Sequence, residues 1–506
     1  MRSLPFLTGT ALLALGVAPA LASADTLREA LLEAYKTNPT LAAQRANVRA
    51  IDENVPIARA SAFPGVQLQS SYTEAVVLPV TSFTAPARTS QTQANLTYSL
   101  YAGGAVKNGI AAADIRVQGG QATLRGTEAD LFSAVVGAYM DVIRDEAIVA
   151  LNRQNVKVLE VNLRASQDRF QVGDLTRTDV AQSDARSAIA RGQLQTAEAR
   201  LISSRESFIR LVGSAPATLD TPPPLPNLPS DPEAAVDIAL SDNPNLLAAQ
   251  KNGDASAYDV KVAHASRLPK VDAFAGGSYT NYFGSLGNFS PNVAATQYDR
   301  SAQLGLRFTL PLYQGGAPSA RIRQAQERRA QALEQVTEAE RAVVAQARSA
   351  HAVWQSSLQV IASSEIAVNA NKLSLEGVRA ENSVGNRTIL DILNAEQELL
   401  NSQVTLVTAR RDAYVAGFAL LAAMGKAEAR DLGLEGGPLY DPSVNAKRVR
   451  NNIWDFASDP DPIITGTRTN ATQAQGSQVT RPLDPILNGG VDRSAPITAG
   501  EATKNR

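Results

Sequence analysis

Two short turns of this 506-residue chain, residues 170–180 and 382–392, contain the side chains whose types and spacing could do chemistry. Each turn has a glycine, Gly173 or Gly385, and an aspartate six residues later, Asp179 or Asp391. A threonine three residues before each aspartate gives the spacing of a helix capping box, and the glycine suits the left-handed position after a helix. A carboxylate is favourable in a first helical turn for that reason alone. The pattern leaves open whether the aspartates only cap helices or also serve a function.

The two turns differ at one matched position, where Leu175 of the first corresponds to Arg387 of the second. If the turns pack side by side, the Arg387 guanidinium can reach Asp179 and the Thr178 hydroxyl and form charge-assisted hydrogen bonds. Such a link would hold the two turns together.

Composition excludes most familiar catalytic and metal-binding sites. The chain has no cysteine and only two histidines, His264 and His351, which rules out thiolate sites, disulfides and multi-histidine metal centres. No segment combines a nucleophile, a base and an orienting group at a recognisable spacing. The 48 basic and 49 acidic side chains leave a net charge of −1, which argues against nucleic acid as a partner. We therefore expect no enzymatic activity and no cofactor.

The first 24 residues indicate a secretory signal peptide. They contain Arg2, an apolar stretch over residues 4–17 and the small residues Ala22, Ser23 and Ala24 at the expected cleavage site. The rest of the chain has no apolar run near the roughly 18 to 20 residues that a spanning helix needs. We expect any membrane-spanning part to be made of strands.

The chain also contains an internal duplication. Short motifs recur 212 residues apart: residues 101–104 with 313–316, 172–174 with 384–386, and 212–213 with 424–425. This pattern predicts a first structural repeat over residues 25–217 and a second over residues 233–425, joined by an extended proline-rich linker at residues 218–232. Residues 426–506 are polar and from Asp459 onward have no periodic pattern, so we expect a mostly disordered tail.

Each repeat contains two segments of alternating apolar and polar residues, at 66–73 and 93–100 and at 271–282 and 301–310. They predict two hairpins and four strands in all. Of the 26 aromatic residues, 13 lie within residues 63–101 and 274–313, which is typical of the aromatic girdles of an outer-membrane barrel. A half-buried soluble sheet is the alternative. Four strands cannot close a barrel, so a barrel would require several copies of the chain.

The segments between the strands and the two turns predict very long helices. Residues 104–169 and 316–379 would each extend about 100 Å at 1.5 Å per residue. Shorter helices at 177–211 and 389–423 follow the turns, which gives two antiparallel helical hairpins. An ordinary coiled coil has the same periodicity. The direct attachment of each long helix to an amphipathic strand argues against that alternative.

In this order, the elements resemble the TolC-type outer-membrane efflux proteins. The residues that match are the Asn-Pro pairs at 38–39 and 243–244, the Tyr-x-Gly-Gly junctions at 101–104 and 313–316, and both tip turns. The resemblance implies an α+β membrane protein that forms a homotrimer. Twelve strands, four per chain, would make one barrel in the outer membrane, continued by a long α-helical tunnel through the periplasm.

The resemblance also implies a function as an outer-membrane export channel. The channel would accept substrate from an inner-membrane ABC or proton-driven transporter and a periplasmic adaptor protein, for type I protein secretion, small-molecule efflux or both. It would contact outer-membrane lipid. The alternative is a periplasmic coiled-coil scaffold or adhesin without a membrane pore.

The resemblance assigns roles at the two tips. Asp391 matches the acidic ring that constricts the family's tunnel entrance. Thr178, Asp179 and Arg387 match positions whose cross-links hold that entrance closed, and Gly173 and Gly385 belong to the tip turns.

Two tip residues depart from the family pattern. Asn394 stands where some members have a second acidic ring, and Asn382 replaces a tyrosine of the closing network. A weaker ring and a looser closure would follow.

Overall fold

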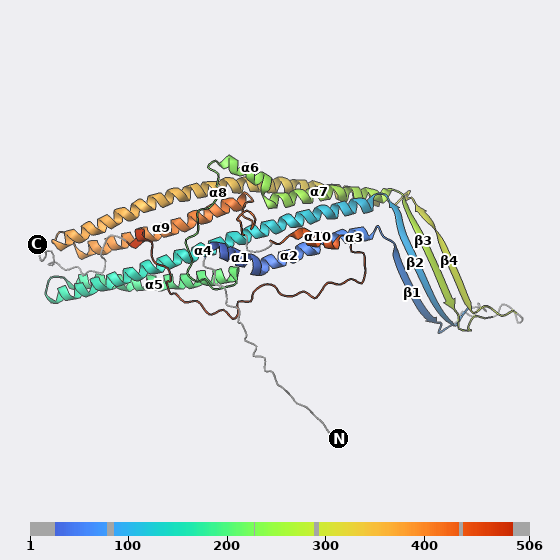
Figure 1. Cartoon of the computed structure of the whole chain (residues 1–506), viewed down its shortest axis with the longest axis horizontal. Helices are drawn as coiled ribbons and strands as arrows, with labels where there is room; N and C mark the ends of the chain where they lie inside the picture. Colours follow the sequence, from blue (N-terminus) through green and yellow to red (C-terminus); the bar gives the residue numbers. More distant parts are fainter. Residues whose placement is uncertain (1–25, 78–84, 227, 288–292, 435–438, 489–506) are drawn as a thin grey trace, which may run out of the picture.

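The computed structural model of the protein describes residues 26–77, 85–226, 228–287, 293–434 and 439–488. The predicted signal peptide, residues 1–24, lies outside the described residues. The chain forms an elongated body in which long helices run side by side, with a sheet at one end and two helical turns at the other (Figure 1). None of the described helices has both the length and the apolar composition needed to cross a bilayer.

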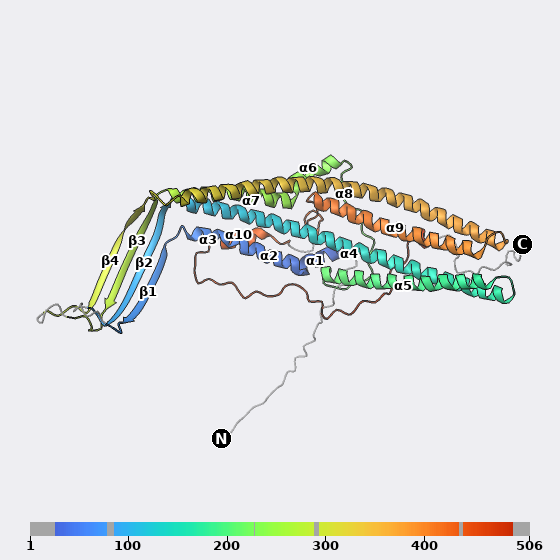
Figure 2. The ribbon, with the colours of Figure 1, turned by 180° about the vertical axis from the view of Figure 1, so that it is seen from behind.

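Two helical hairpins make up most of the body. The long helices α4 (Ala105–Gln171) and α8 (Ala317–Ser383) have 67 residues each, or about 100 Å. The shorter helices α5 (Arg177–Val212) and α9 (Ile389–Ala423) run back along them (Figure 2). The predicted long helices and hairpins are confirmed.

Shorter helices begin each repeat. They are α1 (Leu27–Thr37), α2 (Pro39–Asp52) and α3 (Asn54–Ala60) in the first, and α6 (Pro232–Asp242), α7 (Pro244–His264) and the 3₁₀ turn η1 (Ala265–Arg267) in the second. Asn38 caps α2 and donates from Nδ2 to Leu211 O at 2.9 Å, and Asn243 caps α7 and donates to Ala423 O at 2.9 Å. Each Asn-Pro pair therefore joins the start of its repeat to the end of that repeat's hairpin.

The described strands form one antiparallel sheet in the order β1-β2-β3-β4. They are β1 (Gly65–Glu74), β2 (Arg88–Ala102), β3 (Lys270–Asn281) and β4 (Tyr298–Thr309). The two predicted hairpins are confirmed, and the pairing of β2 with β3 joins them. β2 begins five residues earlier than predicted, because residues 88–92 pair with the end of β1 although their side chains do not alternate.

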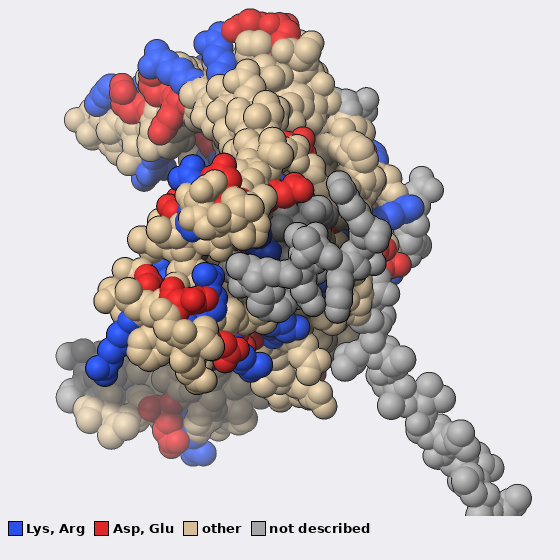
Figure 3. Space-filling view, turned by 90° about the vertical axis from the view of Figure 1, so that its left-hand side faces the viewer, with Lys and Arg blue, Asp and Glu red and all other residues tan. Residues whose placement is uncertain are grey.

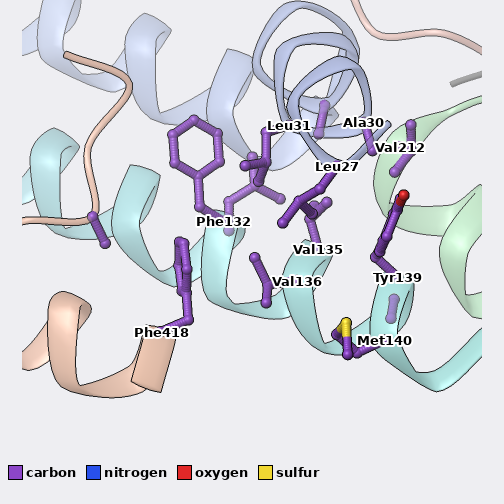
Figure 4. Close-up of a cluster of buried hydrophobic side chains, with 14 of the residues drawn as sticks. Leu27, Ala30, Leu31, Phe132, Val135, Val136, Tyr139, Met140, Val212 and Phe418 are labelled. Carbon is purple, nitrogen blue, oxygen red and sulfur yellow. The ribbon is translucent and has the colours of Figure 1, made fainter. Parts of the chain in front are cut away.

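The largest apolar cluster surrounds the middle of α4. Phe132, Val135 and Tyr139 of α4 are fully buried, and the rings of Tyr35 and Phe132 lie 6.2 Å apart. Residues from α1, α4, α5 and α9 meet there (Figure 4). The cluster fixes the N-terminal helices against the first hairpin.

Residues 439–488, part of the tail for which we expect disorder, make defined contacts with the rest of the chain at several positions. This segment contains the short helices α10 (Pro442–Val449) and α11 (Pro485–Asn488), and Leu487 is only 4 % exposed. Residues 426–434 also fold inward, with Ala427, Ala429 and Leu434 buried. Several contacts of the tail go through backbone carbonyl groups, which leave no periodic pattern in the sequence.

Candidate functional site

The two hairpin tips lie at the end of the molecule farthest from the sheet. Gly173 and Gly385 have φ values of +87° and +84°, a region that residues with a side chain rarely adopt. Their amides donate to Phe170 O and Asn382 O, both at 3.0 Å. The glycines therefore close the tight turns, as predicted.

Both predicted capping boxes are present. Asp391 Oδ2 accepts hydrogen bonds from the Thr388 amide at 2.9 Å and the Thr388 hydroxyl at 2.7 Å, and Asp179 Oδ2 accepts from Thr176 at 3.0 and 2.7 Å. These hydrogen bonds hold the pKa of each aspartate below its ordinary value. Both carboxylates are therefore ionised at neutral pH while they cap their helices.

Within one chain, Arg387 does not reach Asp179 or Thr178. Its Nε donates to Oε2 of Glu381, on the same hairpin, at 2.7 Å, and both side chains are about half exposed. The predicted link between Arg387, Asp179 and Thr178 is therefore not formed within the single chain. The sequence spacing did not indicate Glu381 as the partner of Arg387, because the two side chains meet only through the geometry of the turn.

The tips meet through an apolar contact instead. Leu175 packs with Ile389 and Leu393 of α9, together with residues of α4 and α5. The position where the two copies differ thus has opposite roles: leucine joins the tips, while arginine stays on its own hairpin. Acidic and basic side chains are interspersed over this end of the molecule (Figure 3).

The two asparagines that depart from the family pattern both have defined partners. Asn382 Nδ2 donates to Arg387 O at 2.6 Å and so stabilises the second turn. Asn394 Oδ1 accepts from Arg186 Nη2 at 2.9 Å, which links α9 to α5. Arg186 could not be predicted as a partner of Asn394, because no sequence spacing relates the two residues. In the described part of the chain, no group of three His, Cys, Asp or Glu residues could hold a metal ion.

The sheet at the opposite end has two chemically different faces. Residues that pair across the strands share a face. One face has the row Val66, Leu96, Ala275 and Leu304, and the next row, on the other face, is Gln67, Asn95, Gly276 and Gln303.

The apolar face is open in the single chain, where Leu304 is 87 % exposed and Leu306 70 %. Tyrosines share this face with the apolar band. Tyr72 and Tyr298 lie in one row beyond the band, and Tyr98 lies within it, in the row of Leu306.

Comparisons with known proteins agree with this arrangement. The sequence model of the family described as outer membrane efflux protein matches residues 30–214 and 235–426. The chain is 34 % identical to the outer membrane efflux protein BepC of Brucella suis biovar 1 over 87 % of this chain and 93 % of that protein. It is 28 % identical to the outer membrane protein TolC of Escherichia coli K12, over 94 % and 98 % of the two chains.

A solved structure has the same fold. A crystal structure of CusC superimposes with a TM-score of 0.69 at 18 % identity, and the match covers 79 % of this chain and 92 % of that chain.

Proposed function

The chain belongs to the outer membrane efflux protein family, and from that premise we propose that three copies close a twelve-stranded barrel and line one export duct. The protein is an outer-membrane efflux channel of the TolC-type fold. The number of copies, the location of the entrance and the identity of the partners are the parts that we propose. Substrate would enter between the hairpin tips, pass along the helices and leave through the barrel.

The unpaired edges of the sheet are the main observation that supports a closed oligomer. Among the described strands, β1 and β4 each have a partner on one side only. Unpaired strand edges are not tolerated in hydrocarbon, so neighbouring copies must supply the missing pairs. The apolar face would contact lipid, and the face with Gln67, Asn95 and Gln303 would line the pore.

The open apolar face also argues against a soluble scaffold or adhesin. A soluble sheet would cover Leu304, Leu306 and Phe308, which are 66 to 87 % exposed. A membrane explains their exposure without a further protein layer.

At the other end, Asp391 would form the acidic ring of the entrance. Three ionised carboxylates on one axis make an oxygen-rich site for cations. Arg387 would reach Asp179 and Thr178 of a neighbouring copy and hold the entrance closed. Gly173 and Gly385 keep the tips narrow enough to approach the axis.

The partners would be a periplasmic adaptor protein and an inner-membrane ABC or proton-driven transporter. The name of BepC refers to efflux, which supports a role in export. The cargo would be chosen by the transporter, because a passive duct accepts what the pump delivers.

Two neighbouring residues of β4 test the proposal. Leu304→Lys puts a charge on the lipid face near mid-strand, which costs roughly 2 to 4 kcal/mol per chain. Gln303→Lys puts the same charge on the pore face. We expect Leu304→Lys to abolish recovery of trimers from outer membranes. Gln303→Lys should leave recovery unchanged and shift the ion selectivity measured in planar bilayers toward anions. Equal recovery of the two variants would contradict the assigned faces.

A further inference from the structure

The C-terminal tail makes specific contacts with the first hairpin through residues 475–480. Arg205 of α5 donates from Nη1 to Gly476 O at 2.6 Å and from Nη2 to Gln478 O at 2.7 Å. Arg153 of α4 donates to Ser477 O at 2.8 Å. Three successive tail carbonyls are therefore bound by guanidinium groups of two helices.

Arg205 is a buried charge that depends on this segment. Its side chain is 8 % exposed and forms an ion pair with Glu146 of α4, which is 3 % exposed. Glu146 also accepts a hydrogen bond from the Thr480 hydroxyl at 3.2 Å. A buried ion pair is stable only when further hydrogen bonds replace water, and here the tail supplies them.

The second repeat has no counterpart of this pair. The positions 212 residues later are Leu358 and Gly417, and a side chain at Gly417 would collide with Leu225 of the linker. The Arg205–Glu146 pair is therefore not part of the duplicated scaffold. It is specific to the helices that hold the tail.

The tail then crosses to the second hairpin (Figure 1). Asp484 pairs with Arg410 of α9 at 2.8 Å, and Lys372 of α8 donates to Ile486 O. Gln403 of α9 donates from Nε2 to Leu487 O at 2.7 Å.

Leu487 belongs to an apolar cluster that contains residues of both hairpins. The cluster also includes Leu151 of α4, Val368 of α8, and Leu400 and Val407 of α9. The end of the tail is therefore buried together with helices of both hairpins.

We propose that residues 475–488 form a clasp that ties α4 and α5 to α8 and α9 and holds the two tips in their closed arrangement. The clasp rests on the proposed duct function. Leu400 is the residue of the Leu487 cluster on α9 that lies nearest the tip, eleven residues after Ile389, or about 16 Å along the helix. The hairpins can separate at the entrance only after Leu487 leaves its cluster.

Thiol labelling of the full-length, detergent-purified trimer tests the docking. Because the chain has no cysteine, Gln403→Cys introduces a single thiol beneath the tail, where Gln403 is 1 % exposed. We expect a second substitution, Leu487→Asp, to accelerate maleimide labelling by more than about tenfold. The buried charge favours a state in which the tail is detached from the helices and the thiol introduced at position 403 is exposed. Ile463→Asp is the matched control, since Ile463 lies in the same tail but is 84 % exposed, and it should leave the rate unchanged. No acceleration by Leu487→Asp would overturn the docking.

Conductance tests the effect on the entrance. Without the added cysteine, Leu487→Asp should raise single-channel conductance in planar bilayers above that of wild type and Ile463→Asp. Faster labelling with unchanged conductance would overturn the clasp, because the tail would dock without holding the tips. Failure of the wild type to conduct would refute the duct itself, and that result is seen before any tail variant is made.

Discussion

The long helices α4 and α8 have the same length and the same place in their repeats, yet α4 is mostly covered and α8 is mostly exposed. α4 contacts α1, α2, α3, α5, α7 and α9, whereas α8 contacts α6, α7 and α9. Ile366 and Leu373 of α8 are each 71 % exposed and lie two turns apart on one face. The two copies thus differ: one long helix holds the chain together, and the other has an exposed apolar surface.

We expect the two copies to differ most in how much stability they lose when a core residue is truncated. Phe132 of α4 is fully buried, and its matched residue, Val344 of α8, is only partly buried. Phe132→Ala should lower the free energy of unfolding by about 3 to 5 kcal/mol, because it opens a cavity, and Val344→Ala by about 1 kcal/mol or less. Chemical denaturation followed by circular dichroism measures both. Equal losses would show that the two helices do not differ in packing.

Sequence patterns predicted the repeats, the four strands and both tips, because each depends on periodicity or on local capping and turn residues. They did not predict the difference in burial between α4 and α8, because it depends on which shorter helices pack against each long helix. The contacts of the tail could not be predicted, because Arg205 and Arg153 bind its backbone carbonyls, which no side-chain pattern records. Glu381 was missed as the partner of Arg387 for a related reason: the pair depends on the shape of the turn.

The tips differ at Leu175 and Arg387, and conductance can show what that difference does. Arg387→Ser should raise single-channel conductance by loosening a link to the neighbouring copy. Glu381→Gln should not, because an exposed ion pair within one hairpin contributes about 0 to 1 kcal/mol and joins no two hairpins. Wild-type conductance in Arg387→Ser would contradict the closing role given to this residue.

Asp391 and Asp179 cap their helices in the same way, so a difference between them would reveal a role beyond capping. Asp391→Asn should weaken block by multivalent cations added on the periplasmic side, because amides replace carboxylates poorly in a cation site. Asp179→Asn should leave the block unchanged. If both variants lower thermal stability alike and neither alters the block, capping is the whole role of both residues.

The smallest expected effect is a pH-dependent change in melting temperature, which should differ between the matched residues Glu128 and Glu340. Burial raises the pKa of Glu128 above its ordinary value of 4.5, although its carboxylate accepts a hydrogen bond from the Ala429 amide at 2.6 Å. The folded chain then binds this proton more tightly than the unfolded chain, so stability falls as pH rises above about 4.5. Glu128→Gln should therefore raise the melting temperature slightly at pH 7 and lose that advantage below pH 4.5. Glu340 is exposed, and Glu340→Gln should change the melting temperature at neither pH.

The mass of the detergent-purified wild-type protein tests the central claim most directly. β1 and β4 need partners from other chains, and the open face of α8 needs a neighbour, so the account predicts one species with the protein mass of three chains. Light scattering corrected for detergent measures this mass. A single monodisperse species with the mass of one chain would contradict both the barrel and the duct.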